Sequence, residues 1–314
     1  MRFQFALVLA ALPFTGSAGG FSGGPGVPRV ASSPAPALSG ARWGEVGHRL
    51  IGQAAADALP DSMPPFFRAA AAQLAYLNPD PDRWRARDER ALDPALEAAG
   101  APEHYVDVEL LPAGALLARD RLAYADSLRA AGLATSRVGL LPYRTLELAQ
   151  RLRVGFRQWR AATDPAERAW IEARIINDAG VLGHYVADGS NPHHTTVHYD
   201  GWVGENPRGF TTERGFHGRF EGQYVASHIE LADVERAAAA PARDLGDLRV
   251  AIWSYIDHTH TFVETLYALD RDEPFGRDTT GPAHEAFAVE RLAAGAEMLR
   301  DLWWTAWVSS GSAD

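Results

Sequence analysis

The sequence predicts an all-α fold, in which one domain is built as a multi-helix bundle. Apolar residues recur at helical spacing in successive runs between residues 43 and 308. Proline and glycine turn signals end several of these runs. No convincing succession of alternating apolar and polar residues lies between them, so strands are not expected. A bundle of this kind can bring side chains from widely separated helices together in its core.

The first helices are predicted from short patterns with clear ends. A helix is expected over residues 43–59, which carry apolar residues at helical spacing and end before a proline. A second helix is expected over 65–77, and the Asn-Pro-Asp-Pro-Asp turn at 78–82 ends it. The charged residues 83–100 are expected to be partly helical. The segment 103–111, EHYVDVELL, is expected to be an extended or irregular connector.

The rest of the chain predicts longer helices. They are expected at about 113–132, 142–162, 166–188, 214–239, 245–269 and 283–308. The aromatic-rich end of the last one, LRDLWWTAWVSS, contains Arg300 and Asp301, so its apolar run is too short to cross a bilayer. We expect this helix to close the core, and we expect no stable membrane anchor.

Composition narrows the function classes. The chain has 314 residues, of which 46% are hydrophobic, enough for a sizeable core. Acidic residues number 40 and basic residues 30, and the net charge of −10 argues against a broad basic face for duplex nucleic acid. Metal ions could still supply positive charge locally for an anionic substrate. Cysteine is absent, which excludes disulfides, thiolate ligands and a cysteine nucleophile.

The N-terminal residues predict export. Residues 1–18 combine a basic residue, a short apolar run and small residues, which is the pattern of a signal peptide. Residues 19–42 are rich in Gly, Pro, Ser and Ala and are expected to form a disordered linker or a removable pro-segment. The helical domain is therefore expected over 43–314. We expect the protein to be secreted or periplasmic, without an obligate protein partner.

The histidine-rich stretch 183–221 is the main candidate site. It contains five of the 11 histidines. His184 and Asp188 stand four residues apart at the end of one predicted helix, and His217 and Glu221 repeat this spacing at the start of another. Residues four apart lie on the same helical face, so each pair can direct an imidazole and a carboxylate at one point. Mixed nitrogen and oxygen ligands favour zinc, with manganese or iron as alternatives.

The apolar surroundings of these pairs bear on their role. A single pair of this kind is more often a surface salt bridge or a helix cap than a metal site. Apolar residues interleave with both pairs, namely Val181, Leu182, Val186, Phe216, Phe220 and Tyr224. This places the polar groups at the edge of a buried face, where unpaired imidazole and carboxylate groups are costly. The pattern therefore favours metal ligands.

Upstream residues have ambiguous roles when each is taken alone. His48 lies among glycines on the first predicted helix and could be a core histidine. Asp82 follows the proline-rich turn and could be a helix N-cap. His104, in EHYVD, precedes apolar residues and is unremarkable by itself.

Together these residues resemble the motifs of the zinc-dependent phospholipase C and single-strand-specific nuclease superfamily, which includes the S-one and P-one type nucleases. The family motifs are an N-terminal tryptophan followed by a histidine, an aspartate before a basic turn, a histidine in an HYxD-like segment, an HYxxDxxxPxH motif, and a last histidine with a carboxylate four residues later. The matching residues here are Trp43, His48, Asp82, His104, His184, Asp188, His194, His217 and Glu221.

The resemblance implies a helical fold of the same type and three zinc ions. One zinc is implied to bind Asp82, His104, His184 and Asp188. A second is implied to bind His194, His217 and Glu221, with open positions for water. The third is implied to bind His48, the shared Asp188, and the backbone amine and carbonyl of Trp43. Within this set, Asp82 and Asp188 are the candidate catalytic residues.

The N-terminus departs from the family pattern. The third zinc needs a free amine on Trp43, but Arg42 precedes it, and signal peptidase favours small residues just before its cut. Either a second protease cuts after Arg42 or this zinc is bound differently. We therefore expect three zinc ions, or two if Trp43 is not the mature N-terminus.

Two ligand assignments have close alternatives in the sequence. Asp80 lies two residues before Asp82, although the basic residues that follow Asp82 favour Asp82, as in the family. His193 lies next to His194, although the spacing of the family motif favours His194.

By resemblance, the expected function is hydrolysis of phosphodiester bonds by a zinc-activated water. The Phe-His…Glu pattern that ends at Glu221 is like that of phospholipases, whereas the long loop between His194 and His217 is like that of nucleases. The expected substrate is therefore single-stranded DNA or RNA, cut by an endonuclease, or a phospholipid headgroup ester. Two alternatives stay open: a catalytically silent, zinc-stabilised binding or structural protein, and a metal-free helical protein.

Overall fold

A computed structural model describes residues 44–115 and 118–311. The segments 1–18 and 19–42, and Trp43, lie outside the described residues. Within the described residues, β-structure is limited to two isolated bridges, Val106 with Gly139 and Tyr199 with Gly201. All other regular structure there is helical. The predicted all-α, single-domain multi-helix fold is confirmed.

The helices fall into a long set and a short set. The long helices are α1 (Gly44–Asp57), α7 (Arg121–Ala130), α9 (Leu141–Ala161), α10 (Pro165–Ser190), α14 (Leu248–His260), α15 (Val263–Asp272) and α16 (Pro282–Ser309). The short helices are α2 (Pro65–Arg68), α3 (Ala71–Leu77), α4 (Asp80–Arg83), α5 (Arg87–Leu92), α6 (Pro94–Gly100), α8 (Thr135–Val138), α11 (Phe216–Gly218), α12 (Val225–His228) and α13 (Leu231–Ala237). Single turns are η1 (Ala101–His104), η2 (Val108–Leu110), η4 (Pro192–Thr195) and the π-type η5 (Arg219–Tyr224).

Local signals in the sequence set where the long helices begin. The Asp164 side chain accepts hydrogen bonds from the backbone N–H groups of Ala166 and Glu167, and Pro165 occupies the first position of α10. Aspartates cap α7 and α14 in the same way, through Asp120 and Asp247. Each cap satisfies backbone donors that the first turn of a helix leaves unpaired.

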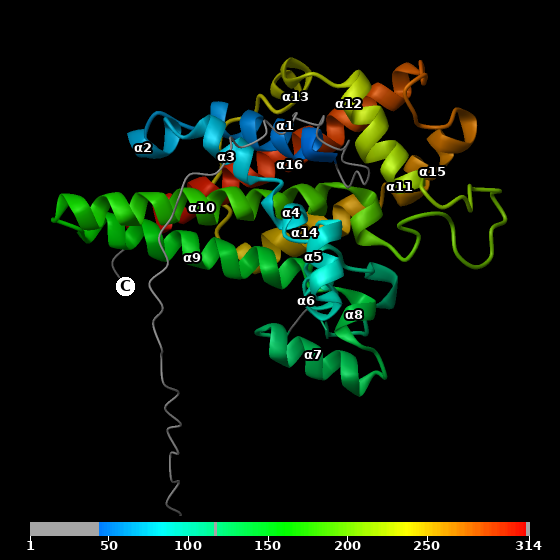
Figure 1. Cartoon of the computed structure of the whole chain (residues 1–314), viewed down its shortest axis with the longest axis horizontal. Helices are drawn as coiled ribbons and strands as arrows, with labels where there is room; N and C mark the ends of the chain where they lie inside the picture. Colours follow the sequence, from blue (N-terminus) through cyan, green and yellow to red (C-terminus); the bar gives the residue numbers. More distant parts are fainter. Residues whose placement is uncertain (1–43, 116–117, 312–314) are drawn as a thin grey trace, which may run out of the picture. The chain divides into compact units, whose positions relative to one another are not determined.

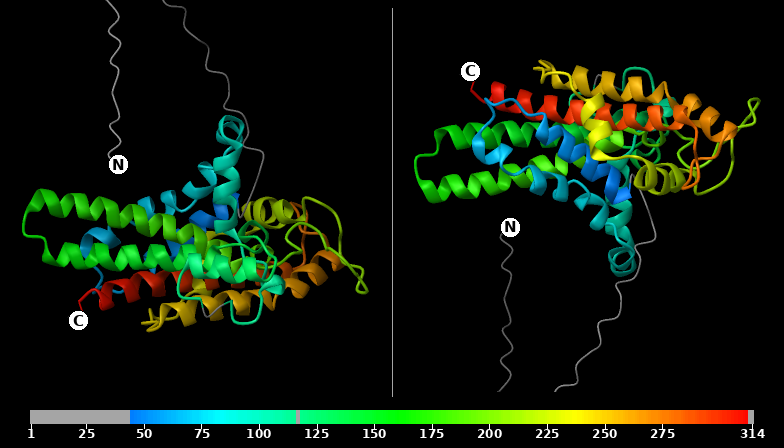
Figure 2. Two further views of the ribbon diagram at one scale, coloured as in Figure 1. Left: turned by 90° about the horizontal axis from the view of Figure 1, so that it is seen from below. Right: turned by 90° about the horizontal axis from the view of Figure 1, so that it is seen from above.

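Helix α10 is the central element of the fold. It packs against α1, α3, α9, α14 and α16. Figures 1 and 2 show α9 and α10 as a long antiparallel pair in green, with α16 in red beside them. Every residue of α10 from Asp178 to Ser190 is buried. The polar side chains in this half of α10 are therefore removed from water and need partners inside the protein.

Four predicted helices differ from the structure. The predicted helix 65–77 is two helices, α2 and α3, because the Ala70 N–H bonds to the Phe67 carbonyl three residues back and tightens the turn. In 113–132, only Arg121–Ala130 is α-helical; Gly114 has a φ of 80°. The Asp120 N-cap starts a helix in the middle of this pattern, so the predicted helix was too long at its N-terminal end.

The other two breaks lie later in the chain. The predicted helix 214–239 stops at His228, and Glu230 starts α13 through a capping box with Asp233. The predicted helix 245–269 begins at Leu248 and divides between α14 and α15 at Thr261, whose hydroxyl donates to the His258 carbonyl. In each case a side chain bonds the local backbone and competes with helix continuation.

The last helix closes the core as predicted. Leu299, Leu302 and Trp303 of α16 are fully buried. Arg300 and Asp301 are buried as well, and they form an ion pair of 2.8 Å. No helix among residues 44–115 and 118–311 is long and apolar enough to cross a membrane.

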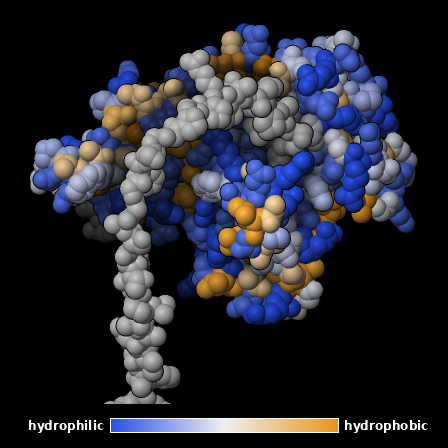
Figure 3. Space-filling model, viewed as in Figure 1, coloured by the Kyte–Doolittle hydropathy of each residue, from blue (hydrophilic) through white to orange (hydrophobic). Residues whose placement is uncertain are grey.

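Exposed apolar side chains gather over one part of the surface. Hydrophobic atoms cluster over α5 and α6 in Figure 3. Leu92 and Leu96 are 79% and 72% exposed, and neither of these two helices has a buried side chain. Polar contacts also hold the α5–α6 segment, such as the partly buried 2.7 Å ion pair of Arg85 with Glu97.

Candidate metal centre

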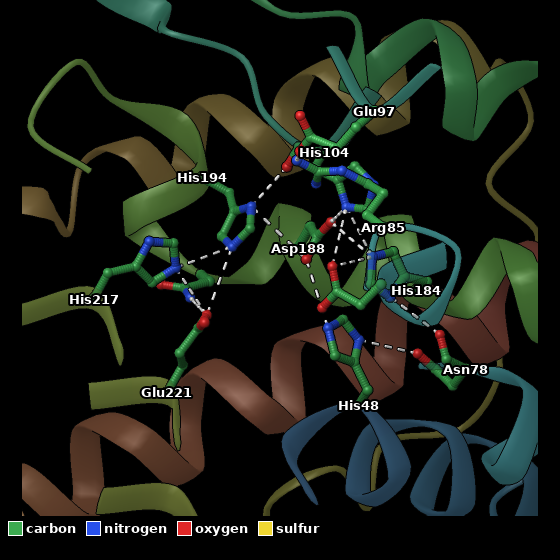
Figure 4. Close-up of polar contacts among 12 residues, drawn as sticks. His48, Asn78, Arg85, Glu97, His104, His184, Asp188, His194, His217 and Glu221 are labelled. Atoms are coloured by element: carbon green, nitrogen blue, oxygen red, sulfur yellow. Dashed lines mark hydrogen bonds and ion pairs between the residues drawn. The ribbon is translucent and has the colours of Figure 1, made fainter. Parts of the chain in front are cut away.

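The buried end of α10 directs an imidazole and a carboxylate at one point. His184 and Asp188 are 0% and 1% exposed, and the His184 Nε2 atom lies 3.3 Å from Asp188 Oδ2. This is the i, i+4 geometry that the sequence predicted. Figure 4 shows both side chains at the middle of a cluster that also includes side chains from distant elements.

The first ligand group adds His104 and Asp82 to these two residues. His104 ends η1, and its Nδ1 atom lies 2.9 Å from His184 Nε2 and 3.1 Å from Asp188 Oδ2. Asp82, on α4, places Oδ1 at 3.9 Å from His104 Nδ1 and 4.0 Å from His184 Nε2. Two imidazole nitrogens and two carboxylates therefore converge on a space that a cation could occupy.

The second ligand group combines η4 with the segment from α11 to η5. His217 Nε2 lies 2.8 Å from Glu221 Oε2 and 3.2 Å from His194 Nε2. The distance from His194 Nε2 to Glu221 Oε2 is 3.6 Å. The Nδ1 atom of His194 donates to the His104 backbone carbonyl at 2.6 Å, so its Nε2 atom is the one that faces this group.

Asp188 faces the first group with one carboxylate oxygen and His48 with the other. Its Oδ2 atom faces the first group, whereas its Oδ1 atom lies 3.7 Å from His194 Nδ1 and 3.7 Å from His48 Nε2. The His48 side chain comes from α1 and is fully buried. It also forms a compact ligand set with Asp82 and His184. A carboxylate with its two oxygens turned to different imidazoles has the geometry of a bridging ligand.

Two properties bear on whether a cation fits this centre, namely the burial of its side chains and the hydrogen bonding of their polar atoms. His48 Nε2 and Glu221 Oε1 are buried without a hydrogen-bond partner among the described residues, a costly state that a bound cation would relieve. Burial, with the neighbouring His184, lowers the pKa of His48 to about 3, which keeps the ring neutral and able to donate a lone pair. Burial alone would raise the pKa of Glu221, but His217 and His194 outweigh it and lower that pKa. These buried groups could therefore hold metal ions.

The structure separates the alternatives that the sequence left open. Asp80 forms a 2.6 Å ion pair with Arg83, whereas Asp82 faces the histidines. His193 is buried beside Phe216, with a ring-centroid distance of 4.7 Å, and among the described residues it belongs to none of the compact sets of possible ligand atoms, whereas His194 does. Asp82 and His194 are therefore the residues of each pair that join the ligand groups.

Neither models of protein families nor curated protein sequences match the chain. Of the nine predicted metal ligands, the eight from His48 to Glu221 come together, and Trp43 lies outside the described residues.

Two asparagines at the centre have roles that the sequence pattern does not predict. Asn191 belongs to a helix stop signal, yet its Nδ2 atom donates to Glu221 Oε2 at 3.1 Å. Asn78 belongs to a turn signal, yet it contacts both His48 and His184. Both asparagines precede a proline. An Asn-Pro pair predicts a turn, so the sequence alone does not indicate that the asparagine also contacts the centre.

A cavity lies beside the first ligand group. Its volume is about 510 Å³, and His104 is part of its wall. The rest of the wall mixes apolar side chains such as Trp84 and Leu96 with two arginines and four acidic residues, namely Arg85, Arg144, Glu89, Asp93, Glu97 and Glu103. The cavity gives a small molecule a place next to the candidate metal ligands.

The aromatic residues of the 198–210 loop pack on the protein itself. Trp202 stacks on His198 with a ring-centroid distance of 3.7 Å and also contacts Tyr267. Phe210 is buried against the same tyrosine. Tyr199, at 45% exposed, is the loop aromatic that keeps a large accessible surface. Trp202 and Phe210 therefore stabilise the loop.

Proposed function

We propose that the chain is a secreted or periplasmic zinc-dependent hydrolase of phosphodiester bonds, a member of the zinc-dependent phospholipase C and single-strand-specific nuclease superfamily. The observation that carries the proposal is the convergence of eight ligand side chains, scattered from residue 48 to residue 221, in one mostly buried centre. Their order along the chain is the order of the motifs that the sequence resembles. A metal-free helical protein would gain nothing from burying so many imidazoles around carboxylates.

Zinc is the proposed metal because the ligands are imidazoles and carboxylates. The first ion is assigned to Asp82, His104, His184 and Asp188. The second ion is assigned to His194, His217 and Glu221. The third is assigned to His48, Asp188 and, where Trp43 is the mature N-terminus, its backbone amine and carbonyl. Bound zinc ions would supply positive charge to a phosphodiester and lower the pKa of water to near neutrality.

The proposed ligands differ in the exposed fraction of their side chains. The side chains of Asp82 and His217 are 21% and 16% exposed, whereas those of Asp188 and Glu221 are 1% and 0% exposed. Asp188 is therefore placed to hold two ion sites together in the interior. Asp82 and His217 keep the larger exposed fractions, and we assign to them the first contact with a phosphodiester of single-stranded DNA, RNA or a phospholipid.

A substrate panel with a matched pair of variants tests the proposal. The purified protein is supplied with zinc and compared on single-stranded DNA, RNA and phosphatidylcholine, with and without a chelator. We expect hydrolysis of at least one substrate, and we expect His217→Ala to reduce it on the order of 100-fold or more because a ligand is lost. His228→Ala is the control, since His228 lies outside the ligand groups and hydrogen-bonds to the Gly276 carbonyl.

These measurements distinguish the proposed hydrolase from its alternatives. Equal activity of His217→Ala and wild type would contradict the ligand role of His217. A protein that binds zinc fully but hydrolyses none of the three substrates would instead be a zinc-stabilised binding or structural protein.

A further inference from the structure

Asn78 contacts two of the candidate ligands from a single position. It lies in the turn between α3 and α4 and is fully buried. Its side-chain Oδ1 atom is 3.1 Å from the Nδ1 atom of His48, and its backbone carbonyl is 3.1 Å from the Nδ1 atom of His184. The two histidines belong to different helices, α1 and α10. Figure 4 shows Asn78 on the outer side of both rings.

These contacts determine which nitrogen of each ring faces the centre. An oxygen of an amide can only accept a hydrogen bond, so each histidine must donate from Nδ1. A neutral ring that carries its proton on Nδ1 has its lone pair on Nε2. Both Nε2 atoms face Asp188, at 3.7 Å for His48 and 3.3 Å for His184. Asn78 therefore leaves both rings in the tautomer that a metal ion at the centre requires.

The contacts also fix the rotation of the two rings. The rings of His48 and His184 are stacked, with their centroids 4.1 Å apart and an interplanar angle of 14°. Each ring is held at one edge by Asn78 and faces Asp188 at the other. A ring fixed at Nδ1 cannot turn its Nε2 atom away from Asp188 without losing a buried hydrogen bond.

Two glycines make room for the Asn78 side chain. A Cβ atom on Gly52 of α1 would lie 3.0 Å from Asn78 Nδ2, and one on Gly183 of α10 would lie 2.4 Å from it. Asn78 thus occupies a space that both ligand-bearing helices leave open by lacking a side chain at the point of contact. A side chain so closely surrounded has little freedom to leave its hydrogen bond with His48.

We propose that Asn78 is a positioning residue, which orients His48 through its side chain and His184 through its backbone carbonyl, and so assembles two ion sites from one turn. This inference rests on the proposed function, in which the two histidines bind different ions. A change of the side chain removes only the contact with His48. The backbone contact with His184 is retained in every variant, which makes the predicted loss specific for one site.

Metal uptake tests the inference without measuring hydrolysis. The full chain is freed of metal and titrated with Co²⁺, and both the bound Co²⁺ per chain and the visible absorption spectrum are recorded. We expect Asn78→Ala to weaken the site that contains His48 by about 10- to 100-fold, so that one fewer Co²⁺ binds at limiting concentration. We expect Asn78→Asp to retain that Co²⁺, because a carboxylate oxygen accepts the same hydrogen bond from Nδ1.

A third variant, at another position, distinguishes a loss of ligand orientation from a general loss of packing. Leu74 is a fully buried residue of α3, and Leu74→Ala is expected to lower the melting temperature without changing bound Co²⁺ per chain. The inference is overturned if Asn78→Ala binds Co²⁺ as the wild type does. It is also overturned if Asn78→Asp loses as much Co²⁺ as Asn78→Ala does. A wild-type protein that binds no Co²⁺ would overturn the proposed function itself.

Discussion

At the scale of single residues, the centre depends on the direction in which a few polar atoms point. Asp188 faces imidazoles from three other elements, and its two oxygens divide between them. The sequence predicted Asp188 because its partner His184 lies four residues away on the same helix. It could not decide between Asp80 and Asp82, because the ion pair of Asp80 with Arg83 is a property of the folded turn.

The role of Asn78 was not predictable from the sequence for a similar reason. Its partners lie 30 and 106 residues away along the chain, and only packing of α1 and α10 brings them together. Spacing along the sequence identifies two candidate ligands that lie on one helix. A residue that hydrogen-bonds to a ligand from a distant element has no such spacing.

Asp107, close to His104 in sequence, makes stability depend on pH. Burial, with the nearby Glu109, raises its pKa to about 7 from an ordinary value of 3.8, although Arg137 opposes the shift. The folded state therefore favours the protonated carboxyl, and this stabilising contribution is full below pH 3.8 and is lost as the pH rises to about 7. An asparagine side chain at this position would be neutral at every pH. We therefore expect Asp107→Asn to raise the free energy of unfolding by up to ~4 kcal/mol at about pH 8.

Denaturant unfolding at two pH values checks this expectation. The stability gain of Asp107→Asn over wild type should be larger at about pH 8 than at about pH 5. A gain of the same size at both pH values, or a loss at the higher one, would show that the charge of Asp107 is tolerated in the fold.

At the scale of elements, α10 has two ends with different tasks. Its N-terminal turn is exposed and capped by Asp164, whereas its C-terminal half is buried and carries His184 and Asp188. The sequence predicted this helix at 166–188, close to the observed Pro165–Ser190, because turn signals at both ends and periodic apolar residues mark it. Predicted helices at 113–132 and 245–269 were too long because a cap or a hydroxyl–backbone bond interrupts an otherwise helical pattern.

Removing the N-cap of α10 tests whether the stability of its first turn affects the candidate ligands at its other end. Asp164→Ala leaves two backbone N–H groups without their acceptor and is expected to lower the free energy of unfolding by ~1 kcal/mol. Zinc bound per chain, determined by elemental analysis, should stay at the wild-type value, because the ligands lie at the other end of the helix. A drop in bound zinc would show that the two ends of α10 are coupled.

At the scale of the whole molecule, the centre ties together elements that are far apart in sequence. Its candidate ligands come from α1, α4, η1, α10, η4 and the α11–η5 segment. Without cations, the buried carboxylates Asp188 and Glu221 and the buried His48 Nε2 atom remain in a region of low dielectric. Ion binding to the native state is therefore expected to contribute to the stability of the entire helical domain.

Chelation measures this contribution directly. A chelator is expected to lower the melting temperature, because an ion at about 100 times its dissociation constant stabilises the native state by ~2.7 kcal/mol per site. Zinc should restore the melting temperature, whereas Mg²⁺, which prefers oxygen ligands, should not. The measurement is thermal unfolding of one preparation before chelation, after it, and after each addition. A melting temperature that does not change on complete removal of zinc would mean that the helices hold this centre in place by packing alone, and the buried imidazoles and carboxylates would then need another source of compensation.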